Sequence, residues 1–434
     1  MTAVVNSYIA EAERLAADRA RSDPAWLTRV RRDALERFDR LGFPTTRDEE
    51  WRFTSVAPIA TEGFVLGHNG ASGVTASDLL PFEWPGHTAT MLVFVNGRSL
   101  PAGSSPRGAQ VLALTRAVSE GVPELESHLT RVAAAARHAF TALNTAFLAD
   151  GAFIHVPDNT VVEAPIHLLF LSVGEGAKTM AHPRVLVAVG KNSQATVVES
   201  YRALGADRYF TNAVTEIAAG NNATVHHYKV QDESPAAFHV GGMYLRAARD
   251  ATLSCHSIAL GGALVRNEVN VVLDGEGCVC TLNGVYLSDR ARLVDNHTTI
   301  DHAKPHCASR EVYKGILADR ARAVFNGKII VRPDAQKTDA KQTSKALLLS
   351  EDAQINTKPQ LEIFANDVKC THGAAVGQMD DEAIFYLRAR GLDERQARRM
   401  LVRAFAGDIL NRVRIAPLRE RIEEALVAQL PRVT

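Results

Sequence analysis

A repeat with a period close to 30 residues runs through the middle of the chain. From about residue 152 to about residue 370, short β-prone runs alternate with turns rich in Gly, Asn and Asp, and no long helix interrupts them. The turn-to-strand units NSQATV, NNATV and RDATL place an alanine every 28 residues, at Ala195, Ala223 and Ala251, and GEGCVC continues the series at Cys278, 27 residues further on. Each period is one structural unit that stacks on the next.

A second series supports the same architecture. The run that begins DRARLV at Asp289 recurs as DRARAV at Asp319, and a weaker echo starts at Glu351. Short, evenly spaced strands also occur in β-sandwiches, but a sandwich is not expected to repeat the same tetrapeptide once per unit. We therefore expect a mainly β fold built on a parallel β-helix, flanked by helical regions at both ends.

The periodicity divides the chain into three zones. Residues 1–150 are expected to form an N-terminal, mainly helical domain, residues 151–375 the β-helix core, and residues 376–434 a C-terminal helical domain. In the first zone the pattern predicts an amphipathic helix near the start and a second helix between Pro24 and Gly42. It also predicts a third long helix over residues 124–149, and a strand followed by an Asn-Gly turn in MLVFVNG.

Capping signals define the C-terminal helices. Asp380 is placed to cap the first of them, and Gly391 is placed to end it. Asp393 and Gln396 have the spacing of a capping box for the next helix. In that helix one apolar stripe is expected, and its members are Ala397, Met400, Leu401, Ala404 and Phe405.

Composition excludes several classes of protein. Apolar residues make up 46% of the 434 residues and charged residues 23%, and the formal net charge is zero. A nucleic-acid-binding protein would usually show a basic excess, so we expect no nucleic-acid partner. The longest apolar runs have about seven residues, too few to span a membrane, and the start of the chain lacks a signal-peptide pattern. Five cysteines without a scaffold spacing indicate reduced thiols in the cytoplasm.

The repeat register suggests roles for three of the cysteines. Two residues beyond each repeat position, Val197, Val225 and Leu253 align with Cys280, so Cys280 and its neighbour Cys278 are expected to be small core residues rather than metal ligands. Two residues further on, the register aligns three residues in one column, namely Glu199, His227 and Cys255. That column is either a hydrogen-bonded polar ladder or a relay for a thiol-borne group.

The two remaining cysteines each lie beside a histidine. His306 and Cys307 are adjacent on the edge of a strand and so are expected to point to opposite faces. Cys370 and His372 differ, because residues two apart can share a face. Thiolate and imidazole are good ligands for zinc and for iron–sulfur clusters, but two ligands are too few for a closed site. The alternative is a buried cysteine beside a surface histidine.

Motifs for independent catalysis are missing from the sequence. There is no Gly-rich phosphate loop of the Walker type, no GxGxxG after a strand, no HExxH and no GxSxG. The enzyme alternative is a β-helix polysaccharide lyase or esterase acting alone. Such an enzyme would need a cluster of carboxylates and basic residues on one solenoid face, and no such cluster can be identified in the sequence.

Several long motifs resemble the SufB/SufD family, the scaffold subunits of the SUF iron–sulfur cluster assembly system. The motifs are RDEEWRFTSV, LNTAFLADGAFIHVP and the run from SREVYKG to CTHGAAVGQMDDEAIFYLRARG. The last of these looks most like the SufD branch, although Thr371 stands where the family usually has serine. The resemblance covers most of the chain, and it implies a right-handed parallel β-helix with helical regions at both ends.

The resemblance also implies partners. A SufD-like protein is a non-catalytic scaffold that pairs with a SufB-like paralogue through the β-helix ends, and it forms a homodimer when isolated. Its histidine at the shared interface, here His372, would help to hold a nascent iron–sulfur cluster or iron, with Cys370 as a weaker candidate. No tightly bound cofactor is expected in the isolated chain. The C-terminal helices would bind the SufC-like ABC ATPase, and the candidate docking residues are Phe385, Arg388, Arg390, Met400 and Phe405.

Overall fold

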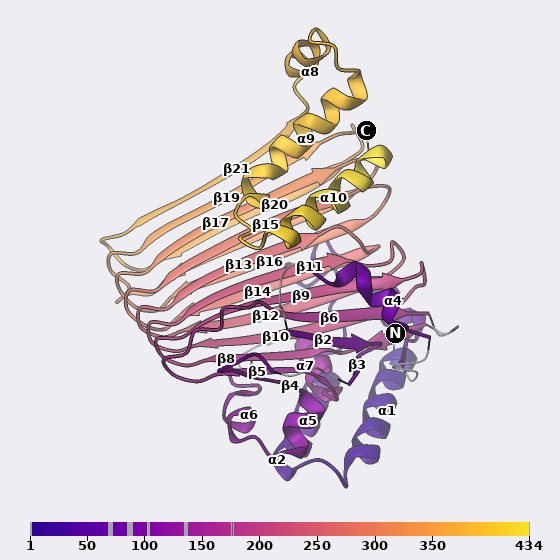
Figure 1. Ribbon diagram of the computed structural model, residues 1–434, viewed down its shortest axis with the longest axis vertical. Helices are drawn as coiled ribbons and strands as arrows, with labels where there is room; N and C mark the ends of the chain where they lie inside the picture. Colours follow the sequence, from indigo (N-terminus) through magenta and orange to yellow (C-terminus); the bar gives the residue numbers. More distant parts are fainter. Residues whose placement is uncertain are drawn as a thin grey trace.

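The structure is a computed structural model that describes residues 2–67, 73–84, 90–101, 105–133, 138–174, 176 and 178–433. Over these residues two long, mainly parallel sheets face each other, and each coil of the chain adds one strand to each sheet (Figure 1). This arrangement confirms the parallel β-helix flanked by helices. Because the strands of one sheet come from successive coils, the hydrogen-bond ladder of each sheet runs along the solenoid axis.

The first sheet, called sheet A, consists of β4 (Gln110–Ala113), β5 (Gly151–Val156), β8 (Arg184–Val189), β10 (Phe210–Ala219), β12 (Phe238–Ala247), β14 (Leu264–Leu273), β16 (Leu293–His302), β18 (Arg322–Val331) and β20 (Gln354–Ile363), with β1 (Val65–Leu66) and β7 (Thr179–Ala181) attached beside β10. The second sheet, called sheet B, consists of β3 (Arg98–Ser99), β2 (Thr90–Val95), β6 (Ile166–Val173), β9 (Gln194–Leu204), β11 (Thr224–Asp232), β13 (Thr252–Ala259), β15 (Val279–Ser288), β17 (Ala308–Leu317), β19 (Asp339–Leu348) and β21 (Lys369–Gln378).

Helices lie at both ends of the solenoid. The N-terminal ones are α1 (Thr2–Arg19), α2 (Ala25–Leu41), the 3₁₀ turn η1 (Glu49–Trp51), α3 (Ala57–Glu62), α4 (Ala76–Leu79), the 3₁₀ turn η2 (Leu80–Phe82), α5 (Leu114–Ser119), α6 (Pro123–His128) and α7 (Ala139–Ala146). The C-terminal ones are α8 (Asp381–Arg388), α9 (Glu394–Leu410) and α10 (Ala416–Val433). None of the described helices is long and apolar enough to cross a membrane.

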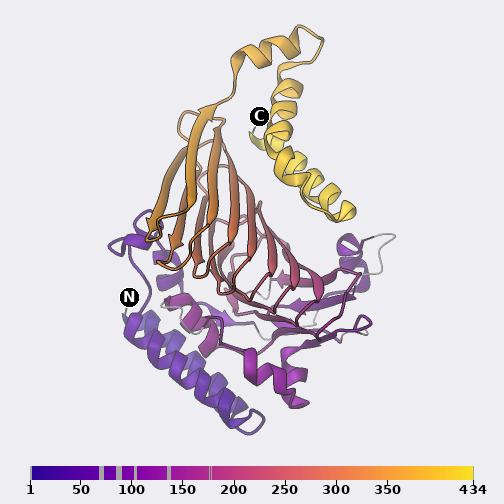
Figure 2. The ribbon, with the colours of Figure 1, turned by 90° about the vertical axis from the view of Figure 1, so that its left-hand side faces the viewer.

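Apolar side chains fill the space between the sheets and also fix the helices to their outer faces. Alternate residues of each strand point inward, as Val225, Leu253 and Cys280 do in one column. The N-terminal helices bury Phe38 and other residues against the outer face of sheet A. The helices α9 and α10 pack on the outer face of sheet B, so the two helical groups lie on opposite sides of the solenoid (Figure 2).

The corners between β-strands explain the turn residues of the repeat. Asn192 and Asn222 adopt positive φ values of 55° and 56°, which asparagine tolerates better than most residues. Their side chains also hydrogen-bond from coil to coil, since the Asn222 amide donates to the Asn192 carbonyl oxygen at 3.0 Å. The Asn-Gly turn expected after MLVFV is likewise present between β2 and β3.

The repeat register is correct from β11 onward but wrong for β9. Thr224 pairs with Thr252, 28 residues on, as expected, but Gln194 pairs with Thr224, 30 residues on. The first coil is therefore two residues longer than the alanine spacing suggests. As a result Glu199 lies beside Lys229 in the sheet rather than beside His227.

One expected helix is broken. Residues 124–149 form α6 and α7 with a non-helical segment between them rather than one continuous helix. Backbone N–H groups of Thr130, Val132 and Ala133 donate to the buried carboxylate of Glu216, at 2.9, 3.1 and 2.9 Å. This carboxylate takes donors that a continuous helix would have used internally, which explains the break.

The apolar stripe expected on α9 is also partly wrong. The helix begins after the predicted capping box of Asp393 and Gln396, but Met400 and Ala404 are exposed. The face that packs on sheet B is formed by Ala397, Val402, Ala406, Ile409 and Leu410. The helix therefore hides one set of apolar residues and leaves part of the expected stripe uncovered.

Candidate functional site

The last strand of sheet B carries the Cys-Thr-His motif at the end of the solenoid. Among the described strands, β21 pairs only with β19 and β20 pairs only with β18, so both are edge strands. Most side chains of β21 are exposed, and α8 stands beyond this last coil rather than between the sheets (Figure 2). The motif therefore lies on an open edge of the fold.

Register places both motif residues in columns that run inward along the solenoid. Cys370 pairs with Ala340, and His372 pairs with Gln342. Gln342 in turn pairs with Glu311, and its amide donates to Glu311 Oε2 at 2.8 Å. His372 is thus the exposed end member of a column whose preceding members are buried polar side chains.

The Cys370 thiol has the character of a packing residue. Its side chain is half-buried against a small apolar cluster that includes Val331, Ala340 and Ala365. Burial raises the pKa of this thiol above its ordinary value. It is therefore a protonated thiol at neutral pH in the chain alone, and it would have to lose its proton to bind a metal.

The His372 side chain is exposed on the same strand. No three His, Cys, Asp or Glu side chains gather into a metal-binding group in the part of the chain that the structure describes. Cys370 and His372 therefore provide at most two protein ligands from this chain, and a four-coordinate metal would need the others from elsewhere.

Inside the solenoid, the structure brings together two members of the proposed polar column despite the shifted register. His227 Nε2 lies 2.7 Å from Glu199 Oε1, and Tyr201 donates to the other carboxylate oxygen at 2.7 Å. Burial opposes ionisation of Glu199, but these hydrogen bonds outweigh it and lower the pKa of that carboxyl. Cys255 is fully enclosed, and burial raises its pKa to about 12. An enclosed, protonated thiol fits a polar ladder better than a thiol relay.

Most of the candidate docking residues lie on the surface of α8, α9 and the turn that joins them. Phe385 is 75% exposed and Met400 is 49% exposed, and Arg388 is also exposed. The Arg390 guanidinium stacks 4.0 Å from the centre of the Tyr386 ring. Phe405 differs, because it is half-buried beneath the Lys314 ammonium group, which lies 4.7 Å from its ring centre.

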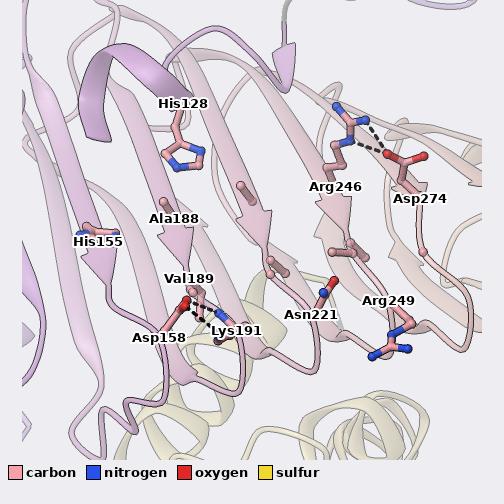
Figure 3. A pocket seen from close by; sticks show the side chains of 17 residues that line it. His128, His155, Asp158, Ala188, Val189, Lys191, Asn221, Arg246, Arg249 and Asp274 are labelled. Carbon is pink, nitrogen blue, oxygen red and sulfur yellow. Dashed lines mark hydrogen bonds and ion pairs between the residues drawn. The ribbon is translucent and has the colours of Figure 1, made fainter. Parts of the chain in front are cut away.

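A cavity of about 660 Å³ lies far from the motif, on the outer face of sheet A (Figure 3). Its floor includes small residues such as Ala188, and His128 and His155 lie toward one end. Charged residues at its rim are already paired, Lys191 with Asp158 and Arg246 with Asp274. The cavity does not include Cys370 or His372.

Sequence reasoning missed one charged cluster on sheet A. Asp295 accepts a hydrogen bond from Arg266 at 2.5 Å, and the two nitrogens of His297 lie 3.1 Å from Asp295 and 3.2 Å from Glu50. The ring of Trp51 covers Arg266 at 4.3 Å. Glu50 and Trp51 belong to the EEWRFTS motif, so the cluster anchors the N-terminal segment to the solenoid. No local spacing could reveal it, because its members come from three distant parts of the chain.

Comparisons with known proteins agree with this geometry. The family model described as "SUF system FeS cluster assembly, SufBD core domain" matches residues 170–405, and the model described as "SufBD protein N-terminal region" matches residues 5–168. An iron-sulfur cluster assembly SufBD family protein of Synechocystis is 34% identical over 92% of this chain and 90% of its own length.

Two relatives carry the SufD name. The iron-sulfur cluster assembly protein SufD of Escherichia coli is 32% identical over 92% of both chains, and that of Bacillus subtilis is 27% identical over 94% of both chains. The two family models together span the solenoid, both flanking regions and the edge strand with its motif. The chain therefore belongs to the SufB/SufD family of the SUF iron–sulfur cluster assembly system and is most like SufD.

Proposed function

We propose that the chain is a non-catalytic scaffold subunit for iron–sulfur cluster assembly in the cytoplasm, which pairs with a SufB-like paralogue and binds a SufC-like ABC ATPase. The cluster, or the iron that enters it, is the cargo of this scaffold. The observation that carries the proposal is the open edge of β21, where the Cys-Thr-His motif lies.

The edge favours a protein partner. An edge strand presents a row of unpaired backbone N–H and C=O groups, and soluble proteins usually protect such edges. Here the last coil also exposes Ile363, Phe364 and Val376. Addition of a strand from a SufB-like solenoid would pair the backbone groups and cover these side chains. The same edge on a second copy of the chain supports a homodimer when no paralogue is present.

The cargo would lie at this junction. His372 would bind iron through a neutral imidazole nitrogen, and the missing ligands would come from the paralogue across the edge. Cys370 is the weaker candidate, because its thiol is half-buried and its pKa is raised.

The C-terminal helices would bind the ATPase. Phe385 and Met400 present apolar surface that the solenoid does not cover, and Arg388 and Arg390 lie on or just beyond the same short helix. An apolar centre with arginine at its margin is typical of protein interfaces. Phe405 is half-buried in the chain itself and so would contribute through the position of α9 rather than through direct contact.

Co-expression with SufB-like and SufC-like partners tests the proposal. The wild-type chain is expected to co-purify with both, and Val376→Asp is expected to reduce pairing with the paralogue because it places a charge on the edge. His372→Ala is expected to pair normally but to lower the iron and sulfide content of the assembled complex at least severalfold. His306→Ala, a second exposed histidine at a corner of the solenoid, is the matched control.

Three results would contradict the proposal. One is a chain that stays alone in the presence of both partners, and a second is turnover of a polysaccharide by the chain without partners. The third concerns only the ligand: full cluster assembly by His372→Ala would remove the role of this histidine while leaving the scaffold intact.

A further inference from the structure

One corner of the solenoid carries a column of small, inward-pointing residues. Each follows directly on a residue with positive φ, and the six such leading residues are Asn192, Asn222, Asp250, Gly277, His306 and Lys337. The column itself consists of Ser193, Ala223, Ala251, Cys278, Cys307 and Thr338, all buried. Two cysteines therefore occupy the same corner in consecutive coils.

These two cysteines are direct neighbours across the ladder. The residues that follow them, Val279 and Ala308, are paired in register, and the Ala308 N–H donates to the carbonyl oxygen of Cys278 at 2.8 Å. In-register positions on adjacent parallel strands lie about 4.8 Å apart. This separation falls within the range of about 4.4–6.8 Å between Cα atoms that a disulfide requires.

The side chains converge as well as the backbones. The sulfur of Cys278 lies 3.1 Å and the sulfur of Cys307 lies 3.2 Å from the same atom, the carbonyl oxygen of Gly275. The two thiols also hydrogen-bond to each other, which lowers the pKa of Cys278 to about 7 and raises that of Cys307. One member of the pair can therefore be a thiolate at neutral pH while the other remains its proton donor.

Other members of the column show what a purely structural residue does at this corner. The Ser193 hydroxyl donates to the Pro157 carbonyl at 2.7 Å, and the Thr338 hydroxyl donates to the Ala335 carbonyl at 2.9 Å. A single hydroxyl thus satisfies the corner, and at Ala223 the corner has no side-chain donor at all. Two adjacent thiols that contact each other are not needed for the turn.

We propose that Cys278 and Cys307 form a redox-active dithiol that closes to a disulfide between two consecutive coils of the solenoid. The oxidant is a low-molecular-weight disulfide such as oxidised glutathione. The Cys278 thiolate attacks one sulfur of the oxidant, and the first glutathione leaves as a thiolate that takes up a proton. Cys307 then loses its proton and attacks the sulfur of Cys278 in the mixed disulfide, which releases the second glutathione. Two protein thiols are oxidised, and one disulfide is reduced to two thiols.

The surface gives the oxidant a route to this corner. Ala248 and Gly275 line the cavity of about 660 Å³ (Figure 3), and their carbonyl oxygens are the atoms that Cys278 contacts, at 3.0 and 3.1 Å. One layer of turn backbone therefore separates the sulfur from the cavity. Because that layer must open for attack, the reaction should take minutes to hours rather than seconds.

The test is a thiol count with peptide mapping. The full-length protein contains five cysteines. After incubation of the folded protein with oxidised glutathione at pH 8, and removal of the reagent, the count in denaturant should fall from five to three. Non-reducing peptide mapping should recover one linked pair, Cys278 with Cys307, and dithiothreitol should restore five thiols. The oxidised protein should also melt a few degrees higher, because the crosslink restricts the unfolded chain.

Substitutions at this corner and nearby separate the pair from general oxidation. Cys278→Ser and Cys307→Ser each leave four thiols, and neither variant should lose any to an internal disulfide or gain in melting temperature. Both should fold, since Ser193 occupies the equivalent corner. The control Cys280→Ala removes a core thiol outside the corner, and its count should fall from four to two.

The proposal is overturned if the wild-type protein retains five thiols after prolonged incubation, or if the linked peptides join any other pair of cysteines. Because these readouts use the wild-type protein, the result stands even if a serine variant folds poorly. They also need neither partner nor cluster, so failure here is distinct from failure of the proposed scaffold function.

Discussion

Glu311 is a carboxyl group held inside the solenoid, and replacing it by glutamine should stabilise the protein in a pH-dependent way. The side chain is 1% exposed. Burial raises its pKa from 4.5 to about 7, although hydrogen bonds from Thr298 and Gln342 act in the opposite direction. One pKa unit corresponds to about 1.4 kcal/mol, so a rise of about 2.5 units corresponds to at most about 3 kcal/mol of lost stability once the group ionises.

The sign follows from the proton balance. Below about pH 4.5 Glu311 is protonated in both the folded and the unfolded chain, so its ionisation costs nothing. Between about pH 4.5 and 7 the unfolded chain releases the proton while the folded chain keeps it, and the free energy of unfolding falls as the pH rises. Above about pH 7 the full cost is present. Glu311→Gln cannot ionise, so the variant should be more stable than wild type at pH 8, by about 2–3 kcal/mol, and nearly equal to it at pH 4.5.

Urea unfolding measured at several pH values between 4.5 and 8 tests this expectation. Far-UV circular dichroism gives the midpoint, and the midpoint shift multiplied by the m value gives the difference between the two proteins. Glu362→Gln, on the exposed part of β20, is the control for loss of one negative charge. A difference that is the same at pH 4.5 and pH 8, or a variant less stable at pH 8, would refute the idea that burial holds Glu311 neutral.

Three further predictions concern other described contacts. Burial disfavours protonation of His297, but Asp295 and Glu50 outweigh it and raise the pKa above the ordinary 6.5; this stabilisation is present below pH 6.5 and lost as the pH rises through the raised value. Urea midpoints should therefore show His297→Gln less stable than wild type at pH 5.5, with a smaller difference at pH 8.5, whereas equal differences would contradict the bridge. Glu216→Ala leaves the fully buried Arg184 without its ionic partner, so the free energy of unfolding should fall by about 3–5 kcal/mol, and a loss below 1 kcal/mol would show that Arg184 finds another partner. Asp393→Ala removes the N-cap of α9 and should cost about 1 kcal/mol, measurable as faster amide exchange in the first turn of α9, with unchanged exchange as the opposing result.

Local signals predicted much of the fold. The 28-residue spacing identified the solenoid because each corner needs a residue that tolerates positive φ followed by a small inward side chain, a demand that recurs once per coil. Capping residues were equally reliable, since Asp380 and Asp393 accept hydrogen bonds from backbone groups only two or three residues away. These features depend on neighbours in the sequence and so can be recognised there.

Contacts between distant segments account for the failures. The helix expected over residues 124–149 is broken by the carboxylate of Glu216, which lies more than 80 residues further along the chain. The stripe on α9 was assigned from composition, but the surface of sheet B selects the face that contains Val402 rather than Met400. The register of β9 was wrong because one coil has two more residues than its alanine spacing suggests. No pattern within a single segment records any of these facts.

The candidate site shows the same division. Cys370 and His372 were recognised because two residues on one strand share a face, but the column that joins His372 through Gln342 to Glu311 depends on the register of three coils. The anchor formed by Glu50 and His297 is likewise a contact between segments almost 250 residues apart.

The open last coil has a consequence for the order of events during assembly. A coil within a solenoid is stabilised by neighbours on both sides, whereas the coil that contains β20 and β21 has a neighbour on one side only. Local opening should therefore cost the least free energy there, and its amide hydrogens should exchange faster than those of the central coils. His372 lies on the part of the solenoid that frays most readily. A partner that adds its own strand to β21 supplies the missing neighbour, so the ordering of the coil and the formation of the junction become one event.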